Sequence, residues 1–322
     1  MSTNSAVYQA DSDLKQTARA APKKQLISDT VYSVLLIAPA LVLILFFALI
    51  PLGYAINVSF RFADLTSPRG VDNYVGLENY HFVLNDDFFW EAAQRTLFFA
   101  VIAVAVEMIA GVAIAFLLHE MRWFKGITRS LIILPLAASP VAVGLIWRNM
   151  YHPDFGVYNY LVSLLGISEQ NWLGDPDLAM YSVIIFDVWQ WTPFVILITL
   201  AGLQALPKEP FEAAQLDGAS TWRVLRTLTF PMLTPVLTLV FVLRTIDAIR
   251  LYDAVFSLTS GGPGTTTEVL TYYLYRTGLR FFRMDRASAM ALLFLYVTVV
   301  FTGLVMRRFM RNIAARTRQM AS

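Results

Sequence analysis

Four charged residues recur at every third position in an otherwise apolar part of the sequence. Arg244, Asp247, Arg250 and Asp253 lie within roughly residues 232–258. On one helix this spacing forms a drifting stripe with opposite charges next to each other. Ionisable groups in a membrane are costly, so they pair with each other or face a water-filled path. The pattern predicts ion pairing, and two roles stay open: a ladder that fixes the helix to its neighbours, or the lining of a translocation path.

This stripe implies a simple rescue experiment. Arg244 and Asp247 are spaced to pair on one helix, so removing either charge leaves the other unpaired. Exchanging the two residues should then restore much of the lost folding. Glu107 and Asp187 are isolated carboxylates in other apolar segments, and we expect them to form hydrogen bonds between helices.

Aromatic residues lie near the same segments. Trp189 and Tyr252 are candidate path residues whose rings could stack on a bound cargo, together with Trp147 and Trp191. Aromatic residues near the ends of membrane spans also serve as interface anchors, and this alternative stays open.

A polar stretch over residues 212–231 separates two strongly apolar segments. Pro207 and Pro210 can begin a short helix that stops at Asp217 and Gly218. Ser220 can cap a second helical piece that runs to Leu228, and Pro231 is expected to break this piece before the next apolar segment. Two short helices with small residues at the bend form a knob suited to a groove on another protein, or else a loop that merely covers the bundle floor.

A third candidate site is a cluster of arginines after the Gly-rich turn at residues 261–264. Arg276, Arg280 and Arg283 have the spacing of one helix face, beside a largely apolar face with Tyr272, Tyr275, Leu279 and Phe282. The pattern is typical of a helix at a membrane surface, where arginines reach lipid headgroups. The alternative is a docking site for an acidic soluble partner.

Several kinds of chemistry find no support in the sequence. There is no cysteine, and the three histidines lie far apart, which excludes disulfides and leaves no metal-ligand spacing. Phosphate loops of the GxxxxGK[ST] type, HExxH and GxSxG motifs are missing too. We therefore expect no catalytic residue, no metal site and no nucleic-acid partner.

The elements that must position these residues are membrane spans. The 322 residues are 57% hydrophobic and only 15% charged, and the mean hydropathy is +0.56. Residues 30–60, 130–147 and 287–306 are free of charge, and residues 96–118, 178–203 and roughly 232–258 carry few charges. We predict an all-α integral membrane protein with six transmembrane helices, a tail at 1–29, a membrane domain at 30–309 with the loop 207–231, and a tail at 310–322.

The distribution of basic residues predicts the orientation of the spans. The tails and the loops on their side carry 15 Lys and Arg residues, whereas the opposite side carries 8. The positive-inside rule then places both termini and the 207–231 loop in the cytoplasm.

The motifs together resemble a known family. Residues 212–214, Gly218 and residues 228–231 resemble the EAA signature of permeases of ATP-binding-cassette importers, with Leu228 in place of the usual Ile. Supporting matches lie at residues 76–80, 191–194, 201–204 and 258–263, the last similar to maltose-type carbohydrate permeases. The resemblance covers about residues 31–309 and implies the fold of a type I importer permease in a prokaryotic inner membrane.

The resemblance also implies partners and roles. It implies a second homologous permease, two cytosolic ATPase subunits that bind the ATP and Mg²⁺, an extracytoplasmic binding protein, and no cofactor in this chain. Seven residues of the coupling helix are implied to contact the ATPase: Glu212, Ala213, Ala214, Asp217, Gly218, Ala219 and Ser220. The cargo stays open among sugars, polyols and sugar or glycerol phosphates.

Two rival classes remain for comparison. An ion-coupled secondary transporter would need an ion-coupling carboxylate and usually has repeated halves, and it would leave the polar knob unexplained. A membrane-embedded enzyme would need clustered catalytic groups, which the sequence does not show.

Overall fold

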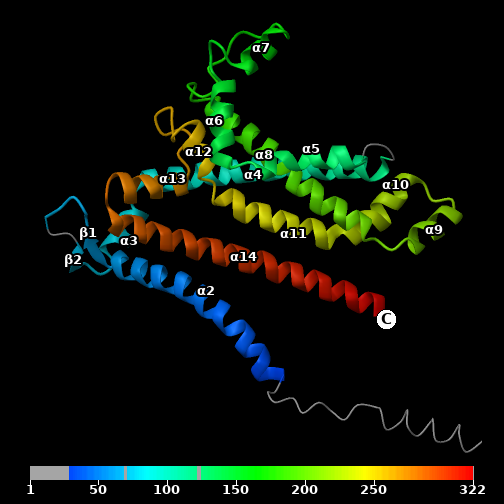
Figure 1. Ribbon diagram of the computed structural model, residues 1–322, viewed down its shortest axis with the longest axis horizontal. Helices are drawn as coiled ribbons and strands as arrows, with labels where there is room; N and C mark the ends of the chain where they lie inside the picture. Colours follow the sequence, from blue (N-terminus) through cyan, green and yellow to red (C-terminus); the bar gives the residue numbers. More distant parts are fainter. Residues whose placement is uncertain (1–28, 69–70, 122–124, 322) are drawn as a thin grey trace, which may run out of the picture. The chain divides into compact units, whose positions relative to one another are not determined.

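The computed structural model describes residues 29–68, 71–121 and 125–321 (Figure 1). The expected N-terminal tail lies outside the described residues as far as residue 28, as does Arg122. The chain divides into two compact units, residues 1–54 and residues 55–322. Helix α2, Asp29–Ser59, supplies the described part of the first unit and ends in the second. Its side chains from Val34 to Ile50 are mostly exposed and apolar, as expected of a lipid-facing span.

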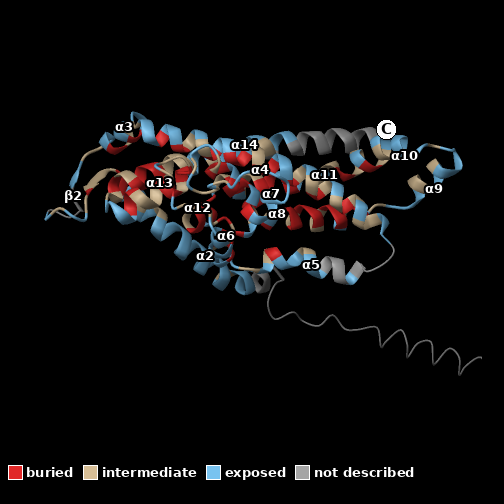
Figure 2. Ribbon diagram, turned by 90° about the horizontal axis from the view of Figure 1, so that it is seen from above, coloured by how far each residue is buried: buried red, intermediate tan, exposed pale blue. Residues whose placement is uncertain are grey.

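In the second unit, α8 (Ala179–Gln204) is the central helix. It packs against α4 (Asp87–Glu120), α5 (Lys125–Ala137) and α11 (Phe230–Ile249). Buried residues lie along much of its length (Figure 2). Helix α4 can approach α8 closely because residue 111 is a glycine: a Cβ there would lie 2.6 Å from the Cβ of Val195. The small side chain thus permits the helix contact that forms the core.

The described residues include five helices long and apolar enough to cross a membrane, and the expected third span differs from the rest. The sequence predicts one continuous helix over residues 130–147, but the segment breaks between α5 and α6 (Pro140–Met150) with a bend of 100°. Pro140 disfavours helical geometry at the preceding residue, and Ser139 is extended with φ −61° and ψ 126°. The described residues provide six membrane crossings only if α5 and α6 together form one crossing.

The fifth span also has other bounds than expected. It runs as one helical stretch from Thr221 to Ile249, through α10 (Thr221–Val224), a π-helical turn η1 (Leu225–Thr229) and α11. Pro231 does not break it, because proline is tolerated in the first turn of α11 and the wide π turn precedes it. The helix ends instead at Ile249, and α12 (Asp253–Leu258) follows.

One end of the unit contains several short elements. Strands β1 (Arg61–Ala63) and β2 (Val71–Tyr74) pair antiparallel, and α3 (Glu78–Leu84) follows. Helix α13 (Leu270–Tyr275) continues into the π turn η2 (Arg276–Arg280). The Thr96 hydroxyl of α4 accepts a hydrogen bond from the Leu270 amide at 2.8 Å, which fixes α13 to α4.

The last helix is longer than the predicted span. Helix α14, Met284–Ala321, includes nearly all of the expected tail at 310–322, whose backbone is helical. Between α6 and α8 lies a short helix, α7 (Val157–Ser163). The remaining helix, α9 (Glu209–Leu216), belongs to the polar loop.

Candidate functional site

The polar loop forms a small helix that is exposed on one face and partly buried on the other, at Pro210, Phe211 and Ala214. Helix α9 begins at Glu209 with Pro210 in its first turn, as expected, and buries no residue. Five of the seven predicted coupling residues are exposed, and Ala214 and Ala219 are partly buried. The exposed face, with Glu212, Ala213 and Leu216, is the one that could contact another protein, as the docking alternative requires.

Gly218 ends this helix by a specific geometry. Its φ is +68°, in the left-handed region, and its amide donates to the Gln215 carbonyl at 3.1 Å. The Ala219 amide donates to the Ala214 carbonyl at 2.9 Å. The two bonds form a Schellman motif, which satisfies carbonyls that a helix end would otherwise leave unpaired. The predicted bend at Gly218 is confirmed.

Other details of the loop differ from expectation. Ser220 occupies the N-cap position of α10, but its side chain forms no cap hydrogen bond. The predicted coupling residues did not include Leu216 and Trp222, which are 90% and 71% exposed. Exposed large apolar side chains next to a polar helix are typical of a binding surface. Their signal in the sequence was the placement of apolar residues inside a polar motif.

The second site is a buried cluster of charges around Arg244, whose side chain is 1% exposed. The guanidinium donates to both oxygens of Glu107, from Nε at 2.6 Å and from Nη2 at 2.7 Å. Nη2 also donates to Asp187 Oδ2 at 2.7 Å. The predicted hydrogen bonds of Glu107 and Asp187 between helices are therefore confirmed, and one arginine joins α4, α8 and α11.

Asp247 differs from the other members of this cluster. It accepts a hydrogen bond from Arg244 Nη1 at 2.6 Å, as the three-residue spacing predicts, yet its side chain is 51% exposed. The two roles considered for the charged stripe thus belong to different residues. Arg244, Glu107 and Asp187 act as structural ties, whereas Asp247 presents a charged oxygen at the surface of a membrane-spanning helix.

The predicted stripe of four charges is wrong beyond Asp247. Helix α11 ends at Ile249, so Arg250 follows it and Asp253 begins α12. Both residues are exposed. Tyr252, between the two helices, stacks with Phe256 at a centroid distance of 5.5 Å.

The candidate tryptophans lie in two different surroundings. Trp189 is 38% exposed and lies 5.1 Å from Trp147, centroid to centroid, in an aromatic cluster, and Trp147 is buried. Instead, Trp191 lies beside the charge cluster, with the Arg244 guanidinium carbon 5.0 Å from its ring centroid. This cation–π contact adds to the stability of the buried arginine.

The external arginines do not share one helix face. Arg276 and Arg280 lie on η2, but the helix stops before Arg283, and Phe282 has φ +56°. Arg276 pairs with the buried Glu268 at 2.9 Å, and Arg283 pairs with the buried Asp285 at 2.9 Å. Tyr272 is buried, so α13 and η2 pack into the unit and do not form a surface helix. Of the three arginines, only Arg280 is exposed.

Glu268 is an unusual carboxyl just before α13. One of its oxygens is buried and, among the described residues, has no hydrogen-bond partner. Burial raises the pKa of the Glu268 carboxyl, although Arg276 and Arg95 act in the opposite direction.

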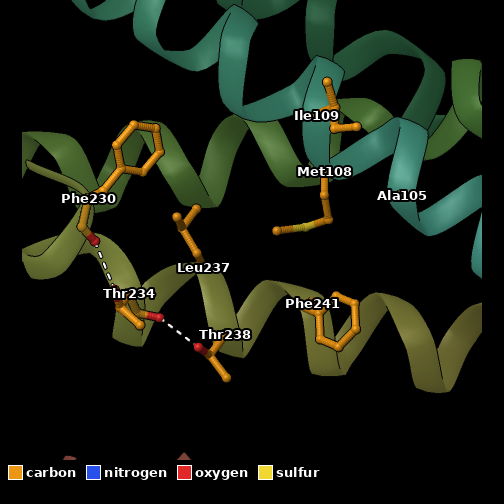
Figure 3. A pocket seen from close by; sticks show the side chains of 8 residues that line it. All are labelled: Ala105, Met108, Ile109, Phe230, Thr234, Leu237, Thr238 and Phe241. Atoms are coloured by element: carbon orange, nitrogen blue, oxygen red, sulfur yellow. Dashed lines mark hydrogen bonds between the residues drawn. The ribbon is translucent and has the colours of Figure 1, made fainter. Parts of the chain in front are cut away.

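A groove of about 450 Å³ lies between α4 and α11 (Figure 3). Its lining is mostly apolar: Ala105, Met108, Ile109, Phe230, Thr234, Leu237, Thr238 and Phe241. The hydroxyls of Thr234 and Thr238 donate to carbonyls of their own helix, those of Phe230 and Thr234. The groove therefore suits apolar side chains or lipid, and nothing in the sequence pattern indicated it.

Residues 107–319 match the family model described as "Binding-protein-dependent transport system inner membrane component". The chain is 37% identical over 247 residues to the trehalose/maltose transport system permease protein MalF of Thermococcus litoralis, covering 76% of this chain and 83% of the relative. It is 34% identical over 240 residues to the trehalose transport system permease protein SugA of Mycobacterium tuberculosis, covering 74% and 76%.

The fold has a counterpart among solved structures. A bacterial transporter involved in the import of the acidic polysaccharide alginate contains a chain that superposes with a TM-score of 0.75 at 22% identity, covering 88% of this chain and 95% of that one. The family match and the relatives favour a permease over an ion-coupled secondary transporter. This chain belongs to the family of binding-protein-dependent transport system inner membrane components and is a membrane-spanning permease of an ATP-binding-cassette importer.

Proposed function

We propose that this chain forms, with a second permease, the path for a carbohydrate that an extracytoplasmic binding protein delivers. The family description supports a binding protein, and the names of two relatives support a cargo such as trehalose or maltose. ATP and Mg²⁺ are bound by two separate cytosolic ATPase subunits. Both termini and α9 lie in the cytoplasm, in agreement with the excess of basic residues on that side.

The observation that carries this proposal is helix α9, which has an exposed face and ends in a Schellman motif at Gly218. A permease without a nucleotide site must receive the motion of its ATPase through a rigid contact. In α9, Glu212 and Ala213 are exposed, and the left-handed Gly218 fixes the bend that follows. We assign the ATPase contact to Glu212, Ala213, Ala214, Asp217, Gly218, Ala219 and Ser220, with Leu216 as an apolar anchor.

Within the membrane, we assign the path to the surface that carries Asp247. A half-exposed carboxylate on a spanning helix is costly against lipid, but it is well solvated in a water-filled path. Its oxygens can accept hydrogen bonds from the hydroxyls of a carbohydrate. Arg250, Tyr252, Asp253 and Trp189 extend this candidate path, while Arg244 holds Asp247 in place.

The external arginines have a smaller role in this proposal. Arg276 and Arg283 are engaged in ion pairs, so Arg280 is the residue that can meet the binding protein directly. The cargo can be tested by thermal shift of the isolated binding protein with trehalose, maltose and glycerol 3-phosphate. Stabilisation by the phosphate and not by the sugars would contradict a carbohydrate cargo.

The coupling role is tested on the full complex in vesicles. A β-branched side chain at φ +68° is strained by about 1–3 kcal/mol, so Gly218→Val should distort the bend, whereas Gly218→Asn tolerates this conformation. We expect Gly218→Val and Glu212→Lys to lose cargo-stimulated ATP hydrolysis at normal membrane levels, and Gly218→Asn to keep most of it. Full hydrolysis by Gly218→Val would show that α9 is not the coupling element.

A further inference from the structure

Trp222 on α10 is exposed although its position in the sequence favours burial. In an uninterrupted α-helix, residues seven positions apart lie on one face. Trp222 is seven positions before Thr229, which is only 5% exposed. A plain α-helix through this stretch would therefore turn Trp222 toward the bundle, yet Trp222 is 71% exposed.

The π turn η1 accounts for the difference. The Phe230 amide donates to the Leu225 carbonyl, five positions back, where an α-helix would use the residue four positions back. The Thr229 hydroxyl donates to the Val224 carbonyl, again five positions back, at 3.4 Å. One extra residue in a turn rotates the preceding helix by about 100° relative to an α-helix of the same sequence. This rotation takes Trp222 off the packed face.

Pro231 explains why the turn is wide. It lies in the first turn of α11, directly after Phe230. Proline has no amide hydrogen, and in α geometry its ring collides with the carbonyl four positions back, here that of Thr227. The wide turn relieves this collision and also sets the direction in which α10 presents its side chains. Single π turns inside helices are rare, and they are frequent at functional sites.

Helix α10 extends beyond the length needed to cross the membrane. Helix α11 has 20 residues, which at about 1.5 Å per residue matches the roughly 30 Å of the hydrocarbon core. Trp222 lies eight positions before Phe230, roughly 12 Å farther along the chain. The stretch between them carries the exposed Arg223 and Arg226. Figure 1 shows α10 beside α9, at the end of the unit where α11 begins.

The surroundings of Trp222 favour the ATPase as its partner. Only Thr221 separates it from Ser220, the last of the residues assigned to the ATPase contact. Tryptophan is among the residue types that contribute most to protein interfaces, and a fixed helix loses little entropy on binding. Resting on the proposed function, we infer that Trp222 is an anchor for the ATPase subunit and that Pro231 positions it through the π turn.

Thiol labelling on the intact complex tests both parts. The chain has no cysteine, so Trp222→Cys introduces a single thiol into it. Membranes that contain this chain and its second permease are treated with a water-soluble maleimide, with and without saturating ATPase subunits. We expect rapid labelling without the ATPase and at least tenfold slower labelling with it. Leu216→Cys on α9 is the positive control, and Ile44→Cys on the lipid-facing α2 is the control for a thiol in lipid.

The controls separate the possible failures. Protection of Leu216→Cys without protection of Trp222→Cys would refute the contact at Trp222. Labelling of Trp222→Cys as slow as that of Ile44→Cys would make this residue a membrane anchor. If the ATPase protects neither Trp222→Cys nor Leu216→Cys, the proposed function of the loop fails instead.

A matched pair of side chains measures the anchor itself. Trp222→Ala should raise the ATPase concentration needed for half-maximal binding by roughly tenfold, whereas Trp222→Phe, which keeps an aromatic ring, should raise it less than about threefold. Equal concentrations for wild type and Trp222→Ala would refute the anchor.

The role of Pro231 is tested by a loss and its rescue. Pro231→Ala allows the π turn to close into α geometry, so Trp222→Cys should react at least severalfold more slowly in the absence of the ATPase. Deleting the exposed Thr227 as well removes the extra residue. Trp222 then lies six positions before Thr229, off the packed face of an α-helix, and the labelling rate should recover.

A merely structural role of Pro231 predicts the opposite, because the deletion would then add damage. Unchanged labelling in Pro231→Ala, or no recovery after the deletion, would overturn the positioning role. If Pro231→Ala is not found in the membrane, the combined variant decides alone: labelling at the parent rate supports the π turn, and slow labelling refutes it.

Discussion

Loss of the Arg244 side chain should be far more damaging than loss of Asp247, although the two form one ion pair. Arg244→Met removes four hydrogen bonds and leaves Glu107 and Asp187 buried without their cation. Removing one partner of a buried ion pair costs about 3–5 kcal/mol. At about 2–4 °C per kcal/mol, the melting temperature should fall on the order of 6–20 °C.

Asp247→Asn provides the matched control for this change. Its carboxylate is half exposed, and exposed ion pairs contribute about 0–1 kcal/mol. We therefore expect a shift of about 4 °C or less. A combined Arg244→Met, Glu107→Gln and Asp187→Asn chain removes every buried charge of the cluster and should recover much of the lost stability, because neutral replacements avoid the desolvation of ions.

The structure reverses one expectation from spacing. Exchanging Arg244 and Asp247 would place a third carboxylate beside Glu107 and Asp187, so the exchange should not restore folding. The assay is thermal unfolding of the detergent-extracted chain, followed by the monodisperse fraction that survives heating. A melting temperature of Arg244→Met equal to that of wild type, or recovery by the exchange, would refute the buried cluster.

Three further predictions concern other sites. Asp247→Asn should reduce cargo uptake at least severalfold while leaving stability nearly unchanged, and equal loss of both would assign Asp247 a purely structural role. Gly111→Ala should destabilise the chain by about 1–3 kcal/mol, because the added Cβ would collide with Val195. The control Gly303→Ala, whose Cβ would have nothing within 4 Å, should be neutral or stabilising. Similar melting temperatures of the two variants would contradict the close contact of α4 and α8. Burial raises the pKa of Glu268 above the ordinary value of 4.5, so its contribution to stability should fall as the pH rises above that value. Wild type should therefore lose stability relative to Glu268→Gln as the pH is raised from 4.5, and a constant difference would contradict the burial of this carboxyl.

Much of the architecture follows from local properties of the sequence. Uncharged runs long enough to cross hydrocarbon predict helices, because a backbone in lipid must satisfy its own hydrogen bonds. The end of α9 at Gly218 was predictable for a similar reason, since a left-handed C-terminal residue favours glycine. The motifs at residues 212–231 then identified the family without any knowledge of tertiary contacts.

Helix breaks were harder to predict, because proline acts differently in different places. Pro140 breaks a span by forcing Ser139 into an extended conformation, whereas Pro231 is accommodated in the first turn of α11 after a π turn. The sequence contains both prolines, but the backbone around them decides their effect.

The roles of the charged residues were decided by tertiary structure alone. Spacing correctly paired Arg244 with Asp247, but Glu107 is 137 positions away in the chain and Asp187 is 57 positions away. Only the packing of α4 and α8 against α11 brings these carboxylates to one guanidinium. The same packing buries Arg244 and leaves Asp247 exposed, because burial depends on neighbouring helices that no local pattern specifies. The sequence by itself thus determined a membrane permease with a short helix in its polar loop, while the fold decided which charges are buried in ion pairs and which one is exposed.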